Sequence, residues 1–154
     1  MTGFLKRMAL ALLIIVSSVP ALAQQEDESG QILAAALGAL DEFMGTFNSK
    51  APEAWAASFN YPHIRFASGQ LNVWNTPEEF AANSPFENLA RTGWDHSHWI
   101  SREVSLLSAD KVHFNTIFQR FNSDNEVIGT YESLYIVTRV NGHWGTQARS
   151  SLAP

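Results

Sequence analysis

The sequence contains no cysteine among its 154 residues. Without a thiol the chain has no disulfide, no thiolate metal ligand, no redox pair and no cysteine nucleophile. Positive charge is also scarce, because 10 Lys and Arg residues stand against 15 Asp and Glu residues, for a net charge of -5. Since nucleic-acid affinity depends on clustered basic residues, we do not expect a nucleic-acid partner.

Several catalytic and cofactor motifs are missing as well. The sequence has no G-x-S-x-G nucleophile elbow, no phosphate-binding loop, no H-E-x-x-H zinc motif and no EF-hand loop. We therefore expect no cofactor. The chain does have 45% hydrophobic residues and five tryptophans. At this length, that composition predicts one globular domain with a sizeable core.

The first 23 residues have the order of a secretory signal peptide. Lys6 and Arg7 precede the apolar run 8–16, and the small-residue pattern Ala21-Leu22-Ala23 follows. The apolar run is shorter than the roughly 20 residues that a membrane span needs. We expect cleavage after Ala23 and a periplasmic or secreted protein that is free of the membrane. The alternative is an uncleaved N-terminal anchor.

The rest of the chain divides into a leader and one domain. The polar segment 24–31 predicts a flexible leader, and 32–154 predict the domain, with Ser29 as a helix N-cap. Apolar residues at steps of three and four predict one face of a helix. These residues are Leu33, Leu37, Leu40, Met44 and Phe47.

Shorter elements follow this helix. Trp55 and Phe59, after Pro52, predict a short second helix, and 64–67 with 70–74 predict a hairpin. The sequence Thr76-Pro77-Glu78-Glu79 is a capping box and predicts a third helix, which Pro85 interrupts or restarts.

The second half of the domain is rich in β-branched and aromatic residues. It predicts antiparallel strands over 94–107, 112–122, 130–140 and 144–151, the last two joined at Asn141-Gly142. Helices followed by strands predict the α+β class, with three N-terminal helices packed on a curved, mostly antiparallel sheet.

This order of elements resembles the NTF2-like superfamily, and within it the SnoaL-like and ketosteroid-isomerase-like domains. The resemblance covers about residues 32–151, and its most telling part is the ending 135–151, with Asn141-Gly142 at the turn and Trp144 just after it. It implies a cone-shaped fold, a pocket between sheet and helices, and homodimers formed through the outer sheet face. Some members of the superfamily isomerise, dehydrate or cyclise small molecules, and others only bind.

The acids of ketosteroid isomerase chemistry are missing. In the isomerases a carboxylate base lies just after the second helix, but 63–69 contain no Asp or Glu. The second acid of that chemistry is protonated and donates beside a tyrosine, and no acid stands at Ser133, Leu134 or Tyr135. This particular reaction is therefore not expected.

Other residues are candidates for the pocket, and each has a plainer structural interpretation. As catalytic groups we single out His96, His113 and Glu132, since histidine titrates near neutral pH and a buried carboxyl exchanges protons. Alternation in the strand also allows His113 to face solvent or a dimer partner, and Glu132 to pair with a nearby arginine. As ligand-binding residues we single out Tyr61, His63, Trp74, Trp99, Asn115, Tyr135 and Arg149.

His96 and His98 would project from one face of a strand. A metal would need a third ligand from His63, His113 or Glu132, and because H-x-H alone is a weak motif we predict no metal site. Three functions then remain open. The first is binding of a small, partly apolar molecule in the cone. The second is a cofactor-free proton-transfer enzyme in the same pocket, and the third is a homodimeric interaction module without catalysis.

Overall fold

The computed structural model describes residues 19–154, with side chains from residue 24 onward. The predicted signal peptide lies outside the described side chains, so export and cleavage after Ala23 remain predictions. Within 19–154, no helix has both the length and the apolar character that crossing a bilayer requires.

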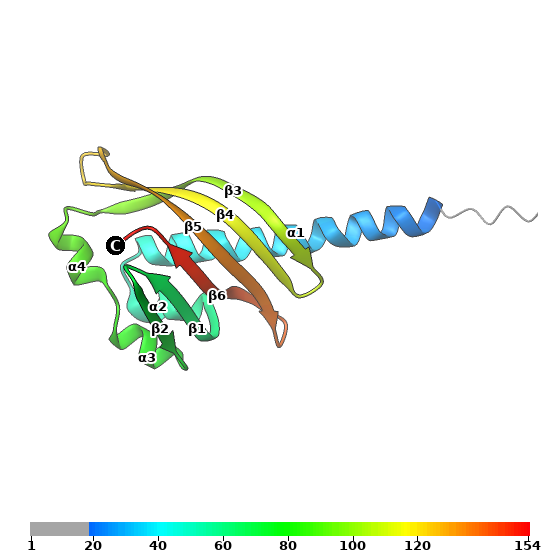
Figure 1. The fold of residues 1–154 in the computed structure, drawn as a ribbon, viewed down its shortest axis with the longest axis horizontal. Coiled ribbons are helices and arrows are strands. Elements are labelled where there is room, and N and C mark those ends of the chain that lie inside the picture. The colour runs from blue at the N-terminus through cyan, green and yellow to red at the C-terminus, as the bar shows by residue number, and fades with distance from the viewer. Residues whose placement is uncertain (1–18) are drawn as a thin grey trace, which may run out of the picture.

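The first helix, α1 (Val19–Asn48), lies across one face of the sheet, and its first turns extend beyond it (Figure 1). The predicted apolar face is confirmed, because Leu40, Met44 and Phe47 are buried in the core. The segment 24–31 is helical rather than a loose leader, and the helix runs through Ser29, which caps nothing. Residues 24–28 are exposed, and their polar sequence does not distinguish an exposed helix from a loop.

A short helix and a two-stranded hairpin follow α1. They are α2 (Pro52–Ala57), β1 (Phe59–Ala67) and β2 (Gln70–Trp74). The expected hairpin is confirmed, but β1 begins at Phe59, which the sequence assigns to the preceding helix. Phe59 is 3% exposed and packs its ring on Trp55 and Phe43. An apolar residue that continues the pattern of a short helix cannot be distinguished by spacing from the first residue of a buried strand.

The N-cap predicted at Thr76 is confirmed at the start of α3 (Pro77–Ala82), but the reciprocal bond of the capping box goes to Asn75, one residue before the cap. The backbone N–H of Glu79 donates to Thr76 Oγ1 at 3.2 Å, and the Glu79 carboxylate accepts from the backbone N–H of Asn75 at 2.7 Å. Pro85 precedes a separate short helix, α4 (Phe86–Arg91). Within residues 19–154, four helices therefore precede the long strands, because two short helices stand where the sequence predicts a single third one.

The remaining strands form a meander of β3 (His96–Ser108), β4 (Lys111–Phe121), β5 (Val127–Val140) and β6 (His143–Ser151). The sheet order is β2-β1-β6-β5-β4-β3, and only the β1–β6 pair is parallel. Asn141 and Gly142, between β5 and β6, both have positive φ, as the predicted hairpin turn requires. The predicted α+β fold, with helices against a mostly antiparallel sheet, is confirmed (Figure 1).

The core lies between α1 and the sheet face that it covers, which we call the inner face; the opposite side is the outer face. Phe43 of α1 is central to the core. Its ring centroid lies 5.3 Å from that of Tyr135 on β5, 5.6 Å from Trp55 and 5.4 Å from Phe59. On β4, Phe114 and the other even-numbered residues are buried on the inner face, and the odd-numbered residues face outward.

Candidate functional site

A cavity of about 520 Å³ opens on the inner face, where β1, β2, α3 and α4 meet. We call it the inner cavity. Its apolar wall consists of Phe47, Trp55, Trp74, Phe80 and Leu89. Its polar wall carries Arg65, Arg120, Arg149, Asn72, Asn83 and Asn88. An apolar hollow with a few convergent polar groups is the usual form of a small-molecule site.

The capped helix α3 supplies one side of this cavity. Phe80 of α3 packs edge-on against Trp74 at the end of β2, with ring centroids 5.0 Å apart, and against Trp55 at 4.9 Å. Because the cap at Thr76 fixes where α3 starts, it also fixes which residue of the helix faces the sheet. The local sequence thus positions the aromatic wall.

Three arginines reach the cavity from three strands. Arg65 of β1 and Arg149 of β6 are register partners, and Arg120 comes from β4. A smaller adjoining hollow of about 30 Å³ is lined by the same three arginines and by Tyr135. Burial lowers the pKa of Arg149 and raises that of Tyr135, so the tyrosine is a neutral hydroxyl at physiological pH.

His63, one of the predicted pocket residues, is buried beside the cavity and does not line it. Its ring stacks on Trp74, with centroids 5.8 Å apart, and Nδ1 lies 3.3 Å from the carbonyl oxygen of Thr146. Burial, together with the charge of Arg149, lowers the pKa of His63 to about 2. A ring this hard to protonate is a poor general base at neutral pH.

The other predicted ligand-binding residues divide into two groups. Trp74 and Arg149 line the inner cavity, and Tyr135 lines the smaller hollow next to it. Tyr61 and Trp99 are held in the packing, because the Tyr61 hydroxyl donates to the Ala56 carbonyl at 2.8 Å and Trp99 Nε1 donates to the Leu40 carbonyl at 3.2 Å.

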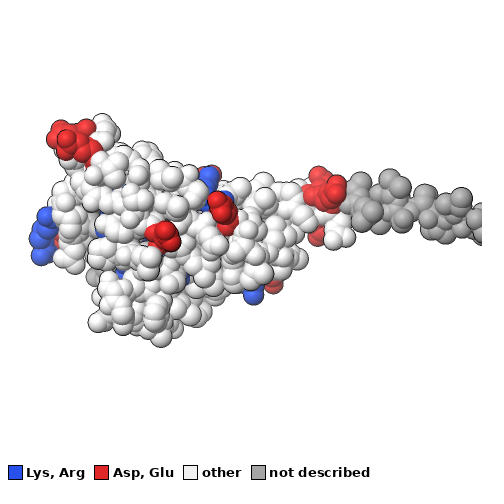
Figure 2. Space-filling view, turned by 45° about the horizontal axis from the view of Figure 1, so that its top comes forward, with Lys and Arg blue, Asp and Glu red and all other residues white. Residues whose placement is uncertain are grey.

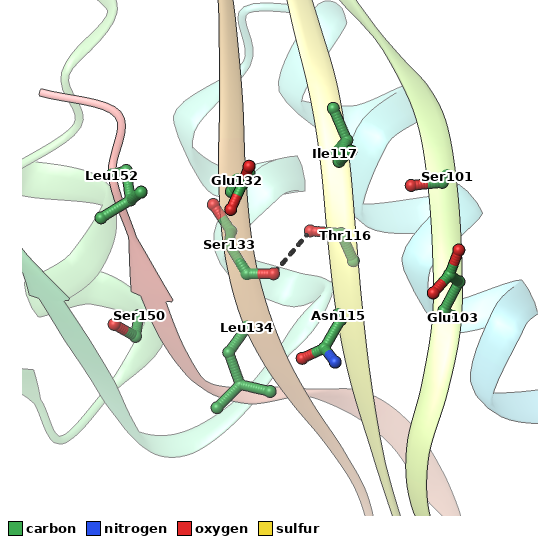
Figure 3. Close-up of a pocket in the computed structure, with 10 residues that line it drawn as sticks. All are labelled: Ser101, Glu103, Asn115, Thr116, Ile117, Glu132, Ser133, Leu134, Ser150 and Leu152. Carbon is green, nitrogen blue, oxygen red and sulfur yellow. Dashed lines mark hydrogen bonds between the residues drawn. The ribbon is translucent and has the colours of Figure 1, made fainter.

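Asn115 and two of the predicted catalytic residues, His113 and Glu132, lie on the outer face. Asn115 and Glu132 line a second hollow of about 480 Å³, the outer groove, which also holds Glu103 (Figure 3). In this view β5, β4 and β3 lie in front of the helices, so the sheet separates the outer groove from the inner cavity.

The predicted catalytic residues are not brought together. His96 pairs with Phe121 at one end of β4, whereas His113 pairs with Leu106 near the other. Eight residues of strand separate the two positions, or about 26 Å at the usual rise per residue. His96 Nδ1 lies 3.0 Å from Asp95 Oδ2 instead. Within the described chain no group of three His, Asp or Glu residues is placed to hold a metal.

Two cavity residues, Arg65 and Arg120, were not among the predicted ligand-binding residues. Arg120 continues the even-numbered series that buries Val112, Phe114 and Phe118 on β4, so strand alternation was sufficient to place it on the inner face. Arg65 has no comparable signal, because it reaches Arg149 only through the parallel pairing of β1 with β6.

Helices over one face of a curved mixed sheet, with a cavity between the two layers, define the class of NTF2-like cone folds. The family described as NTF2-like protein (DUF6841) matches residues 35–149, and the chain belongs to this family. No curated protein matches the sequence.

Solved structures with the same fold share little sequence with this chain. An NTF2-like protein of unknown function from Shewanella oneidensis is 12% identical, with a TM-score of 0.63, covering 78% of this chain and 98% of that one. A ketosteroid isomerase-like protein from Erwinia carotovora is 21% identical, with a TM-score of 0.58, covering 79% and 97%. A Catenulispora acidiphila protein in complex with S-DNPA is 12% identical, with a TM-score of 0.64, covering 80% and 93%.

Proposed function

We propose that this chain is an exported NTF2-like domain that binds a small, partly apolar molecule in the inner cavity. The observation that carries the proposal is the cavity itself, about 520 Å³ in volume, with tryptophan and phenylalanine on one side and polar groups on the other. The Catenulispora acidiphila protein of the same fold is in complex with S-DNPA. That complex supports binding as a use of this fold.

Binding is favoured over proton-transfer catalysis by the composition of the wall. The residues that line the inner cavity include no Asp, Glu or His. Arginine does not act as a base at neutral pH, because its guanidinium stays protonated. Glu132 and His113 lie behind the sheet. A ligand in the cavity would therefore be held by groups that bind, with none that removes a proton.

A fluorescence titration with neutral N-phenyl-naphthylamine tests binding. We expect its emission to rise as it enters the apolar cavity, and to rise less in Asn88→Trp, which places an indole in the wall. Ala90→Trp is the control, because Ala90 is exposed on the same helix and lies outside the lining. Equal emission from both variants and the parent protein would remove the cavity from the proposal. For export, the N-terminus of the protein recovered from the periplasm or the medium should be Gln24.

We also propose that a second copy of the chain covers the outer face. Apolar side chains project from β1 and β2 on that face, where Phe66 is 54% exposed and Leu71, its register partner, is 63% exposed. Contiguous apolar patches on monomers are small, so a larger one indicates an interface. Figure 2 shows few charged side chains on the face in view. A two-fold axis places the same patch of both chains against each other.

Light scattering of the purified protein tests the dimer. We expect the mass of two chains, and the mass of one chain for Phe66→Glu, because a carboxylate buried without a partner opposes association. Glu126→Lys, at an exposed turn, should leave the dimer intact. If the parent protein were monomeric at high concentration, the proposal that a second copy covers the outer face would be wrong. A different partner would then have to cover that face.

A further inference from the structure

The arginines of the inner cavity have no acidic counterpart within the described chain. Arg65, Arg120 and Arg149 all line the cavity, and the ion pairs found among the described residues involve other groups. Pro154 also lines the cavity, and no ion pair joins it to an arginine. The rest of the polar wall is uncharged, consisting of Asn72, Asn83, Asn88 and Thr92.

Two of these guanidinium groups have unused hydrogen-bond donors. Arg120 is only 8% exposed, and its Nε has no hydrogen-bond partner, nor has the buried Nε of Arg149. An unpartnered donor in the interior destabilises a fold, and an unpaired charge does so more strongly. Burial and the neighbouring Arg149 lower the pKa of Arg65 to about 10, so this arginine remains charged at neutral pH.

Aromatic rings hold these cations in place without neutralising them. The guanidinium carbon of Arg149 lies 5.2 Å from the ring centroid of Trp55 and 5.3 Å from that of Phe43, and that of Arg120 lies 4.9 Å from Tyr131. Such contacts orient a guanidinium without using its N–H donors. Arg149 bonds to the Tyr135 hydroxyl and Arg120 to the Tyr131 hydroxyl, and Arg65 donates to the Ala153 carbonyl at 3.3 Å. The cluster is therefore held in place, and the Nε donors of Arg120 and Arg149 still lack an acceptor within the described chain.

We propose that the ligand of the inner cavity is an organic anion, an aromatic or alicyclic carboxylic acid. Its carboxylate would be bound by Arg149 and Arg120, with Arg65 close by, and its ring would lie against Trp74 and Phe80. The planar fork of arginine matches the two oxygens of a carboxylate. The inference rests on the proposed binding function and names the chemical class of the ligand.

Isothermal titration with naphthoate and its neutral amide, naphthamide, tests the charge requirement. We expect naphthoate to bind more tightly than naphthamide. Arg149→Met should weaken naphthoate binding by about tenfold to a hundredfold, the usual value of a charge-assisted hydrogen bond, and leave naphthamide within about twofold. Arg139→Met removes an exposed arginine from the far end of β5 and should change neither affinity.

The melting temperature without ligand separates a binding role from a structural one. If the cluster awaits an anion, Arg149→Met removes an uncompensated charge and melts no lower than the parent protein. If Arg149 serves only as a packing element, the variant melts lower and the preference for naphthoate persists. The melting temperature and the naphthoate preference of Arg120→Met test the same distinction at a second arginine.

The outcomes also distinguish the two proposals. Equal affinity for naphthoate and naphthamide, or an unchanged preference in both arginine variants, would overturn the anion assignment and leave small-molecule binding standing. Absence of binding by either probe at millimolar concentration, together with a silent N-phenyl-naphthylamine titration, would overturn the proposed function and the anion assignment with it.

Discussion

In the middle of the sheet the inner face carries the guanidinium groups of Arg120 and Arg149, whereas the outer face over β3 and β5 carries the carboxylates of Glu103 and Glu132. The two signs of charge are thus separated by the thickness of one sheet. Stability alone favours the opposite arrangement, because a buried charge costs least when its partner lies beside it. We attribute the unpaired cations on the covered side to the proposed anionic ligand.

The apolar residues of the two faces differ in a similar way. Inner-face aromatics contact one another and α1, so they form the core. Outer-face apolar residues such as Phe66 and Leu71 are more than half exposed and contribute little to the fold of one chain. The inner face therefore combines folding with the cavity, and the outer face is available for association.

The largest expected effect is on folding stability. Phe114→Ala on the inner face, where the side chain is 0% exposed, should lower the free energy of unfolding by about 3–5 kcal/mol, because a large apolar side chain is lost and a cavity remains. Leu106→Ala, at a residue 62% exposed on β3, should change it by less than about 0.5 kcal/mol. Urea denaturation measures both. Similar losses would show that the outer face belongs to the core.

The sequence predicts this division of faces well on β4 and poorly elsewhere. On β4 the residues Val112, Phe114 and Phe118 share one face, so alternation identifies the covered face. Arg120 continues the same series. On β5 the alternation is weaker, and Glu132 stands between Tyr131 and Ser133, so the side of the carboxylate was left open. Arg65 and Arg149 meet through a pairing between distant strands, which no local pattern contains.

The helical part illustrates the same limit. The cap at Thr76 was predictable because its hydrogen bonds join residues three or four apart in the chain. The extent of α1 was not predictable, because residues 24–28 are exposed and their polar sequence carries no apolar periodicity. The local sequence could therefore suggest a residue at a strand end such as Trp74 for the pocket, and the structure places Trp74 in the cavity wall.

The next effect depends on pH and on the buried histidine of the inner side. The pKa of His63 is lowered to about 2 in the folded state, from 6.5 for the free group. Below pH 6.5 the unfolded chain binds a proton that the folded chain does not, so this part of the stability is present above that pH and lost as the pH falls. Between pH 7.5 and 5.0 the loss from His63 alone is about 2 kcal/mol.

His63→Asn should remove this loss and keep a donor near the Thr146 carbonyl. Urea denaturation at the two pH values measures the difference, and His98→Gln, at an exposed residue on the outer side of β3, is the matched control. An unchanged pH dependence in His63→Asn would mean that His63 is protonated in the folded protein.

The smallest expected effect is a difference between two threonine variants. Thr76 caps α3, the helix that forms one wall of the inner cavity, and Thr130 lies on the outer face. Thr76→Ala removes the side-chain oxygen that accepts from the Glu79 N–H, and should cost about 1 kcal/mol in the free energy of unfolding. Thr130→Ala on β5 removes an exposed contact with Gln119 and should cost less than about 0.5 kcal/mol. Because α3 carries Phe80 and Asn83 into the cavity wall, Thr76→Ala should also weaken binding of N-phenyl-naphthylamine, and Thr130→Ala should not. If the two variants bound the probe equally well, the position of α3 would not govern the cavity, and the link between the N-cap and binding would fail.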